Sequence, residues 1–297
     1  MKSPGLSVLI PVYNRAVEEL VGQLLAQVAA WPGPVEIRLL DDGSTTLRKQ
    51  NRALARLEGV EYEELPQNVG RAAVRNRLVA QARYPWLLLL DNDSLLPDAQ
   101  FLARYAAAVA EAPVLVGGTC YEALPPPEPA LYLRWHYGRQ REARPARLRQ
   151  QQPYAQLTIN NLLIRAEVFR RFGLDESLTR YGHEDTQFGW LLRQAAVPIR
   201  HLDNPVCHDG LEPAEAFLRK SRDAVRNLAG LYRRAGLGAD TRLVQAALRL
   251  RRLGLAGAAR RALAAAAPRL EANLLSARPS LRAFDALKLY WLLLEWR

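Results

Sequence analysis

The sequence contains only two cysteines, Cys120 and Cys207, among its 297 residues. They stand far apart and in no metal-ligand or redox spacing, which indicates a reduced environment rather than a disulfide-stabilised scaffold. No charged, apolar and small-residue segment opens the chain as a secretory signal would, and no run of about 18 apolar residues is present to cross a bilayer. These absences predict a cytoplasmic protein, with any membrane contact limited to peripheral binding at the inner face.

Positive charge is concentrated at one end of the chain. Residues 211–297 hold 17 Lys and Arg against 7 Asp and Glu, whereas residues 1–210 are almost balanced, with 24 against 23. This division predicts a nearly neutral domain over 1–210 and a basic helical extension over 211–297. A basic extension attracts phosphates such as those of anionic lipids, although a solvated helical face has the same composition. Its arginines are not interleaved with an aromatic platform, so no nucleic-acid partner is expected.

Apolar runs and helical stretches alternate through the first hundred residues, and the apolar content of 49% is enough to bury a sizeable core. The alternation predicts an α/β fold with a mainly parallel sheet and helices on both faces. The expected strands are 8–12, 36–40, 60–65 and 86–90, and the expected helices are 18–30, 47–57 and 70–82.

Two later segments depart from this alternation. Between Glu122 and Pro153 lies a Pro-rich and Arg-rich stretch that is too long and irregular for an ordinary connection, which is typical of a lid or binding loop. The end of the chain, Leu287 to Trp296, is apolar and aromatic but too short to span a membrane. We expect it either to lie in a membrane interface or to pack against other helices of the extension.

Acidic residues directly follow two of the expected strands, at the place where open α/β sheets bind ligands. Asp91-Asn92-Asp93 comes after Trp86–Leu90, and two carboxylates one residue apart suit Mg²⁺ or Mn²⁺. Asp41-Asp42-Gly43-Ser44 follows another apolar run and can accept hydrogen bonds from a nucleobase and a ribose. Each cluster taken alone is also compatible with an ordinary turn.

Further polar residues point to the same kind of chemistry. Asn68-Val69-Gly70-Arg71, with Arg75 one turn later, places guanidinium groups and a helix N-terminus within reach of a diphosphate. Glu184 and Asp185 open another expected helix, where neighbouring side chains point about 100 degrees apart, so only one of them can face a substrate. A carboxylate there can take the proton of an attacking hydroxyl, or it can simply stabilise the helix N-terminus.

The motifs, in their order and spacing, resemble the inverting glycosyltransferases of family 2, whose catalytic domain has the GT-A fold. The resemblance covers about residues 6 to 209. It implies transfer of a sugar from a nucleotide-diphosphate donor, most often a UDP-sugar, to a hydroxyl of a glycan or glycolipid acceptor. The similar segments are Val8 to Arg15, Leu40 to Ser44, Asn68 to Asn76, Asp91 to Asp93, Asn160 to Asp175 and Gly182 to Asp185.

The resemblance also implies roles for single residues. Asp93 would bind the metal, Mn²⁺ or Mg²⁺, directly, and Asp91 would contact the ribose or a water on the metal. Asp185 would be the catalytic base with Glu184 bracing it, and His208 lies where some members place a histidine ligand to the metal. The implied donor-binding residues are Pro11, Tyr13, Asp41, Asp42, Asn68, Gly70, Arg75, Asp91 and Asn92.

Two other functions are compatible with parts of the pattern. A sugar-phosphate nucleotidyltransferase uses a related sheet but should carry a Gly-rich basic loop after the first strand, where Pro11 to Arg15 has no glycine. A non-catalytic carbohydrate- or membrane-binding protein on the same fold would not need intact acids at positions 91, 93 and 185. The residues therefore favour a metal-dependent inverting glycosyltransferase with a GT-A domain and a C-terminal helical extension.

Overall fold

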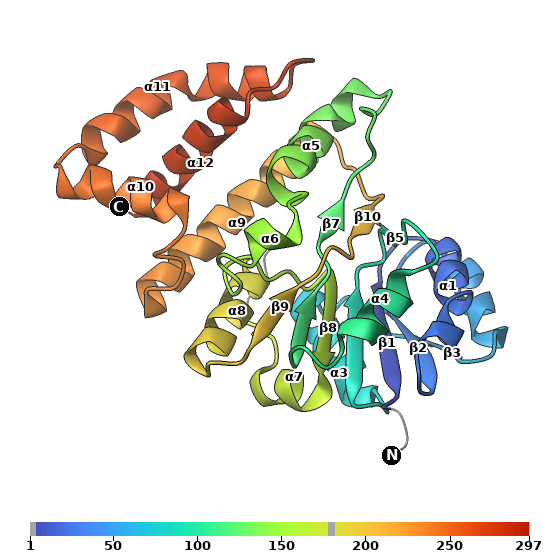
Figure 1. Cartoon of the computed structure of the whole chain (residues 1–297). Coiled ribbons are helices and arrows are strands. Elements are labelled where there is room, and N and C mark those ends of the chain that lie inside the picture. Colours follow the sequence, from blue (N-terminus) through green and yellow to red (C-terminus); the bar gives the residue numbers. More distant parts are fainter. Residues whose placement is uncertain (1–3, 178–181, 297) are drawn as a thin grey trace. The chain divides into compact units, whose positions relative to one another are not determined.

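The computed structural model describes residues 4–177 and 182–296, and the chain divides into two compact units (Figure 1). Unit 1 is built around a sheet with helices on its faces, and unit 2 consists of helices. Unit 1 comprises Met1–Glu122, Glu142–Ser177 and Phe188–Gly210, and unit 2 comprises Ala123–Arg141, Leu178–Gln187 and Leu211–Arg297.

The main sheet of unit 1 has seven strands in the order β3-β2-β1-β4-β8-β6-β9. β8 is antiparallel to both of its neighbours, and the other strands are parallel to one another. The prediction of a mixed but mainly parallel α/β sheet is therefore confirmed. The strands are β1 Leu6–Val12, β2 Val35–Asp41, β3 Val60–Glu64, β4 Trp86–Leu90, β6 Val114–Val116, β8 Asn161–Arg165 and β9 Ile199–His201.

Alternate side chains of the central strands enter two separate apolar clusters, one on each face of the sheet. Val8 and Ile10 of β1 belong to the cluster that α1 and α4 cover, whereas Leu9 belongs to the cluster under α3, α7 and the end of α8. Successive residues of a strand point to opposite faces, so this buried strand is apolar throughout. The helices are α1 Glu18–Leu25, α2 Arg48–Arg52, α3 Arg71–Gln81, α4 Phe101–Ala108, α6 Ala146–Arg149, α7 Ala166–Phe172 and α8 Glu184–Gln194.

A second, small sheet lies next to the acidic turn that follows β4. It has the order β5-β10-β7, with β10 antiparallel to β5 and parallel to β7. The strands are β5 Ser94–Leu95, β7 Thr119–Cys120 and β10 Val206–His208. Because β5 directly follows Asp93, this sheet connects the acidic turn to a distant part of the sequence.

The stretch from 122 to 153 is not the loop that its prolines indicated. It forms a 3₁₀ helix over Pro129–Leu131, α5 over Tyr132–Tyr137, a π-helical turn over Gly138–Glu142 and then α6. Pro129 is the first residue of the 3₁₀ helix and Pro145 immediately precedes α6. Proline is well tolerated at these positions because the amide it lacks would have no partner within the helix. The prolines here therefore begin helices instead of breaking them.

Unit 2 has an apolar core of its own, formed by α5 and four C-terminal helices. Leu287, Trp291 and Leu292 of the last helix are all buried in this core. The apolar end of the chain therefore packs against other helices of the extension, as one of the two expectations held. Among residues 4–177 and 182–296, no helix is both long and apolar enough to cross a membrane. The four helices are α9 Ala214–Ala235, α10 Arg242–Arg252, α11 Ala256–Leu274 and α12 Leu281–Glu295.

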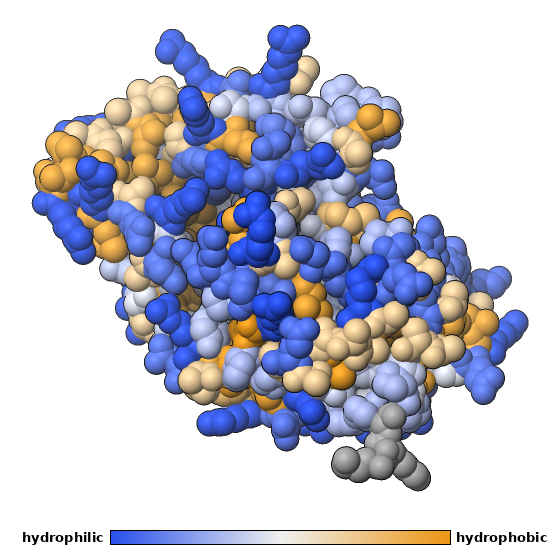
Figure 2. All heavy atoms as spheres, in the orientation of Figure 1, coloured by the Kyte–Doolittle hydropathy of each residue, from blue (hydrophilic) through white to orange (hydrophobic). Residues whose placement is uncertain are grey.

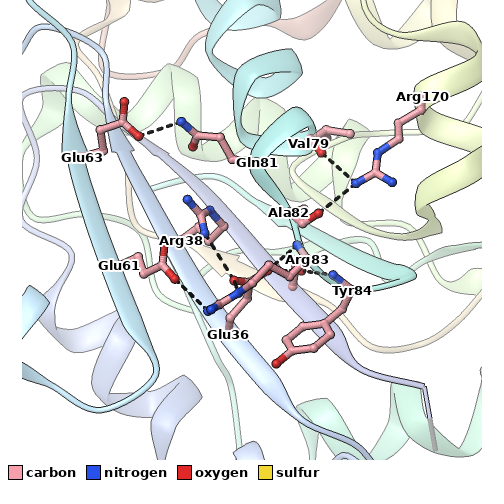
Figure 3. A network of polar contacts seen from close by, with 11 residues as sticks. Glu36, Arg38, Glu61, Glu63, Val79, Gln81, Ala82, Arg83, Tyr84 and Arg170 are labelled. Carbon is pink, nitrogen blue, oxygen red and sulfur yellow. Dashed lines mark hydrogen bonds and ion pairs between the residues drawn. The ribbon is translucent and has the colours of Figure 1, made fainter.

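The buried carboxylate of Glu36 joins β1, β2 and the segment before β4 at the amino-terminal edge of the main sheet (Figure 3). Glu36 of β2 is only 1% exposed and accepts hydrogen bonds from Ser7 Oγ at 2.5 Å and from Arg83 N and Nε at 2.8 and 2.6 Å. Burial alone would raise the pKa of Glu36, but the hydrogen bonds from Ser7 and Arg83 and the charge of Arg83 hold it below its ordinary value.

Replacing Glu36 by alanine is expected to lower the free energy of unfolding by about 2–3 kcal/mol, because charge-assisted hydrogen bonds are lost and Ser7 is left without its acceptor. The depressed pKa means that this contribution is present above the pKa of an unfolded glutamate and is lost as the pH falls through the folded value. Urea unfolding across this pH range measures the effect. The exposed Glu63, which accepts from Gln81 Nε2 at 2.7 Å, supplies the control, and Glu63→Ala should change stability by less than about 0.5 kcal/mol. Equal losses for the two variants would contradict the expectation.

Candidate active site

The turns that follow β1 and β2 are joined by one asparagine. Asn14 has a φ of 49°, its side-chain Oδ1 accepts from Thr45 N at 2.7 Å and Thr46 N at 3.1 Å, and its own amide donates to Ser44 Oγ at 2.8 Å. The neighbouring Tyr13 side chain is 47% exposed. The two turns therefore form one continuous edge that presents an aromatic ring to solvent. Pro11, the other donor-binding residue expected here, lies within β1 opposite Leu40 of β2.

The two acids expected to contact a nucleobase are already engaged by the protein. Asp41 is fully buried and accepts from Ser44 N at 2.6 Å and Tyr62 Oη at 2.8 Å. Asp42 is 4% exposed and accepts from the amides of Val69 and Gly70 at 2.7 and 3.1 Å. Burial raises the pKa of Asp42, although these amide hydrogen bonds oppose the increase. In this arrangement, the two carboxylates stabilise the turn after β2 and the loop before α3 through hydrogen bonds.

The loop before α3 passes very close to the turn after β2. Gly43 has a φ of +73°, and a Cβ there would lie 2.5 Å from the amide nitrogen of Asn68, which is too close for any side chain. Asn68 itself is exposed, and Gly70, with a φ of +93°, precedes the first residue of α3. The glycine at position 43 therefore allows the loop to sit against the nucleotide-side turn.

An ion pair links α3 to the acidic turn after β4. The guanidinium of Arg75 contacts the carboxylate of Asp91 and also donates to the carbonyl of Arg71 at 3.2 Å. Burial would raise the pKa of Asp91, but the positive charges of Arg75 and Arg71 hold it below its ordinary value. Asn76, which was expected to lie near a diphosphate together with Arg75, instead bonds the backbone of Leu174 at 2.9 and 3.0 Å.

Strand pairing in the small sheet brings His208 to Asp93. His208 of β10 is paired with Ser94 of β5, and the amide of Asp209 donates to the carbonyl of Asp93 at 2.8 Å. The imidazole Nε2 of His208 then lies 3.6 Å from Asp93 Oδ2. Gly210 packs against the same carboxylate, since a Cβ there would lie 2.3 Å from Oδ2. Two of the residues expected to bind metal are thus neighbours, although 115 positions separate them in the chain.

The imidazole of His208 is held from two sides. Its ring stacks on that of Tyr121, with centroids 5.3 Å apart and planes 17° from parallel, and the Tyr121 hydroxyl donates to the carboxylate of Glu142. The amide of Gly210 donates to His208 Nδ1 at 3.0 Å. Because Nδ1 accepts, a neutral ring carries its proton on Nε2, the nitrogen that faces Asp93. Metal ligation of a neutral ring through Nε2 would require the proton on Nδ1 instead, at the expense of the hydrogen bond from the Gly210 amide.

The donor set around Asp93 fits a hard divalent cation that shares its shell with a substrate. Among residues 4–177 and 182–296, no three or more His, Cys, Asp or Glu side chains are grouped so as to hold a metal ion by themselves. Asp91 is turned toward Arg75, which leaves the carboxylate of Asp93 and the nearby imidazole of His208. Mg²⁺ and Mn²⁺ commonly take only one or two protein carboxylates and complete their shell with phosphates and water.

Sequence reasoning missed an ion pair beside this cluster. The Arg15 guanidinium contacts the carboxylate of Asp209 and donates to its carbonyl oxygen at 2.9 Å. The pair joins the turn after β1 to the segment that follows His208. Asn92, an expected donor contact, reaches the same turn through a long hydrogen bond of 3.5 Å to the carbonyl of Tyr13. Arg15 and Asp209 each adjoin a residue that sequence analysis had singled out, but nothing in the sequence indicates that they pair.

The two cysteines form a disulfide, contrary to the expectation from the sequence. Cys120 of β7 and Cys207 of β10 are directly paired in the small sheet, with Cα atoms 4.5 Å apart. Their sequence separation of 87 residues gave no sign of this, because only the pairing of the two strands makes them neighbours. The disulfide therefore links β7 to β10, the strand that contains His208.

Removing the disulfide is expected to destabilise unit 1 by about 2–4 kcal/mol, because a cross-link over a long loop restricts the unfolded chain. Urea unfolding of the wild type with and without a reductant measures the loss, and a Cys120→Ala/Cys207→Ala variant should match the reduced wild type and ignore the reductant. A wild-type midpoint that reductant leaves unchanged would show that the bond contributes nothing.

The acids expected on the acceptor side open α8, in the part of that helix that belongs to unit 2. Glu184 and Asp185 are both half-buried in the first turn. The preceding His183 has a φ of 73°, its carbonyl accepts from Gln187 N at 3.1 Å, and its Nδ1 lies 3.1 Å from Thr186 Oγ1. Burial and, to a smaller extent, the charge of Lys288 lower the pKa of His183 to about 4, so its ring is neutral at pH 7.

The sheet order and the acidic turns at the carboxyl ends of its parallel strands define an α/β domain of the GT-A type. Residues 7–172 match the family described as Glycosyl transferase family 2. This match covers more than half of the chain, and the chain belongs to that family. The predicted family and fold are therefore confirmed.

Similar proteins agree with this assignment. Validoxylamine A glucosyltransferase of Streptomyces hygroscopicus subsp. limoneus is 31% identical over 226 residues, which are 66% of this chain and 49% of that protein. The enzyme of the same name from S. hygroscopicus subsp. jinggangensis strain 5008 is also 31% identical over 226 residues, 66% of this chain and 53% of that protein. The chain thus spans about half the length of the curated relatives it matches.

Two solved structures share the fold. The mannosyltransferase PcManGT from Pyrobaculum calidifontis, in complex with GDP-Man and Mn²⁺, superposes with a TM-score of 0.61 at 16% identity, covering 98% of this chain and 85% of that one. TarS 1–349 of S. aureus gives a TM-score of 0.51 at 19% identity, covering 96% and 89%. At such identities the likeness shows the fold alone.

Proposed function

We propose that this protein transfers a sugar from a nucleotide-diphosphate donor to an acceptor hydroxyl, with inversion at the anomeric carbon. The observation that carries the proposal is the placement of Asp93 in the turn between β4 and β5, with the imidazole of His208 3.6 Å from its carboxylate, in a chain of glycosyl transferase family 2. A non-catalytic binding protein would have no need to bring these two side chains together from distant parts of the chain.

Donor binding is assigned to the carboxyl edge of the main sheet. Tyr13 is exposed there and can stack on a nucleobase, while Asp41 and Asp42 fix the shape of the adjoining turns. The diphosphate would lie toward the N-terminus of α3 and Asp93. Asp93, together with His208 in the tautomer that carries its proton on Nδ1, would hold a Mn²⁺ or Mg²⁺, which would supply positive charge for the leaving diphosphate.

The chemical step needs one base. Asp185 accepts the proton of the acceptor hydroxyl while the hydroxyl oxygen forms a bond to the anomeric carbon of the sugar. The bond from that carbon to the diphosphate oxygen breaks, and the nucleoside diphosphate leaves with the bonding electrons. A single displacement of this kind inverts the configuration. Glu184, the neighbouring acid, would brace the first turn of α8.

The identities of the substrates are proposals at a finer level. PcManGT is known in complex with GDP-Man and Mn²⁺, and TarS 1–349 is known in complex with UDP-GlcNAc, which shows that this fold accommodates different nucleotides. For this chain we propose a UDP-sugar as donor and a glycan or glycolipid as acceptor. The acceptor's own hydroxyl would be the nucleophile that Asp185 activates.

Peripheral contact with an anionic membrane, at the inner face of the cell membrane, is proposed for unit 2 on the basis of charge and exposure. The apolar end of α12 is buried, so it is not the contacting segment. Leu253 and Leu255, between α10 and α11, are 60% and 49% exposed, and Leu253 directly follows Arg251 and Arg252. Figure 2 shows hydrophobic atoms among hydrophilic side chains over these helices. Exposed leucines beside arginines suit the surface of an anionic bilayer.

Incubation of the purified chain with a panel of nucleotide-sugars and Mn²⁺ tests the proposed reaction. We expect one class of donor to release nucleoside diphosphate, release to stop when a chelator is added, and the transferred sugar to show inverted anomeric configuration by NMR. A product with retained configuration would refute the single displacement. Failure of every donor to bind or react would support the non-catalytic alternative.

A further inference from the structure

Unit 2 contains a cavity of about 420 Å³ that plays no part in the reaction proposed above. It is enclosed by the end of α5 and the following turn, by the first residues of α10 and by one side of α12. This volume falls within the range of about 300–1,000 Å³ that is typical of pockets for small organic ligands. The lining residues are Tyr137, Arg141, Arg242, Leu243, Ala246, Asp285, Ala286, Lys288 and Leu289.

The polar part of the lining carries a positive charge. Three of the residues are cationic, and the only acid among them is Asp285. Its carboxylate accepts from Arg141 Nη2 at 2.8 Å and lies 3.3 Å from Lys288 Nζ, so a single acid orients two of the cations. Cationic residues therefore outnumber acidic ones in the lining, which favours an anionic ligand.

Arg242 differs from the other two cations of the cavity. It is the first residue of α10, its side chain is exposed, and within the described part of the chain it makes no ion pair or side-chain hydrogen bond. The first turn of α10 contains no acidic residue, so the positive end of the helix dipole adds to the charge of its guanidinium. Arg242 is therefore available to a ligand at no cost to the fold.

The remaining walls of the cavity are apolar. They are formed by Leu243 and Ala246 of α10 and by Ala286 and Leu289 of α12, with Tyr137 as the aromatic member of the lining. Inorganic phosphate would leave these walls in contact with water, and a neutral hydrocarbon would make no polar contact with the guanidinium of Arg242. A molecule that carries both a phosphate and a hydrocarbon chain satisfies the two parts of the lining together.

We propose that this cavity binds a single-chain amphiphile with a phosphate head group. The phosphate lies among Arg141, Arg242 and Lys288, and the hydrocarbon chain lies against the apolar residues of α10 and α12. Such a ligand can come from a bilayer, as a lipid whose head group enters the cavity, or from solution, as a free chain phosphate. The proposal does not depend on the identity of the sugar donor.

Calorimetric titration of the full chain with decyl phosphate, below its micelle concentration, tests this directly. We expect saturable binding that decyl maltoside, with the same chain and a neutral head, does not reproduce, and that inorganic phosphate reproduces only weakly. Equal binding of the maltoside, equal binding of inorganic phosphate, or no binding of decyl phosphate would overturn the proposal. Vesicles of phosphatidylcholine with phosphatidic acid distinguish the source: binding to them assigns a bilayer lipid, and its absence beside decyl phosphate binding assigns a soluble ligand.

Two variants locate the ligand. Arg242→Gln should weaken decyl phosphate binding about ten-fold or more, because a charge-assisted contact is lost, whereas Arg249→Gln, at an exposed position of the same helix outside the cavity, should leave it unchanged. Ala246→Phe should block the cavity and abolish binding through its volume alone. Thermal unfolding confirms that each variant is folded. Equal affinities of the wild type and both cavity variants would show that the ligand binds elsewhere.

Discussion

Asp185→Asn is expected to lower kcat for sugar transfer by about 10²–10⁴-fold, the range that a general base contributes to a reaction. A hydroxyl is a poor nucleophile until its proton is removed, and an asparagine amide cannot accept that proton. Donor affinity should stay within about two-fold of the wild-type value, because Asp185 is assigned to the acceptor's hydroxyl and to no part of the nucleotide. Rapid-quench measurement of transfer, combined with fluorescent titration of the nucleotide, separates the two quantities.

Two control variants show whether the loss of kcat is specific to position 185. Asp223→Asn removes an exposed carboxylate of α9 that pairs with Arg226 at 3.2 Å, and it should leave kcat unchanged. Glu184→Gln, at the neighbouring position of the same helical turn, should cost less than Asp185→Asn, because it is assigned a bracing role. A full loss in Glu184→Gln with activity retained in Asp185→Asn would reverse the two roles.

Strands β1 to β4 of the main sheet were predictable because each of them is specified by its own residues. The apolar runs that became β1 and β4 are buried on both faces, so their sequences are continuous and easy to recognise. The strands β6, β8 and β9 of the main sheet were not predicted, and neither were β5 and β7 of the small sheet. β5, β7 and β10 have two or three residues each, and segments this short carry no periodic signal. Their existence depends on pairings between distant parts of the chain.

For the site residues, the sequence likewise indicated which residues belong to the site but not which residues they contact. The acids at positions 41 and 42 were recognised as polar residues at the end of a strand, which is where the structure places them. The sequence did not indicate that Tyr62 and the amides of Val69 and Gly70 would occupy their oxygens, because Tyr62 lies in β3 and the two amides lie in the loop that follows it. Likewise, the disulfide became apparent only once β7 and β10 were paired.

For two segments whose composition fits more than one structure, packing against other helices determines which structure forms. The stretch from 122 to 153 was interpreted as a lid or binding loop, yet Leu133 of α5 is buried in the core of unit 2. The end of the chain is equally suited to a membrane interface or a helical core, and the burial of Trp291 and Leu292 selects the core. Composition alone was insufficient because both outcomes remove the same apolar surface from water.

Asp93→Ala is expected to reduce kcat/KM by at least about 10²-fold and to abolish the effect of Mn²⁺ on donor affinity. The reason lies in the geometry around the carboxylate. Asp91 is already paired with Arg75, and His208 Nδ1 accepts a hydrogen bond from the Gly210 amide, so Asp93 is the acid left to face a cation. Without it, the diphosphate would bind through arginines alone and its leaving charge would be poorly stabilised.

The measurement is nucleotide titration with and without Mn²⁺ for the wild type, for Asp93→Ala and for Asp98→Ala. Asp98 is a suitable control because its carboxylate is 48% exposed, pairs with Arg104 at 2.9 Å and lies only five residues farther along. Asp98→Ala should keep the Mn²⁺ dependence, since an exposed ion pair contributes little and touches no substrate. If Asp93→Ala keeps it as well, the cation is held elsewhere. The pair between Asp91 and Arg75 would then have to open to admit the metal, and Arg75→Gln would be expected to raise Mn²⁺ affinity.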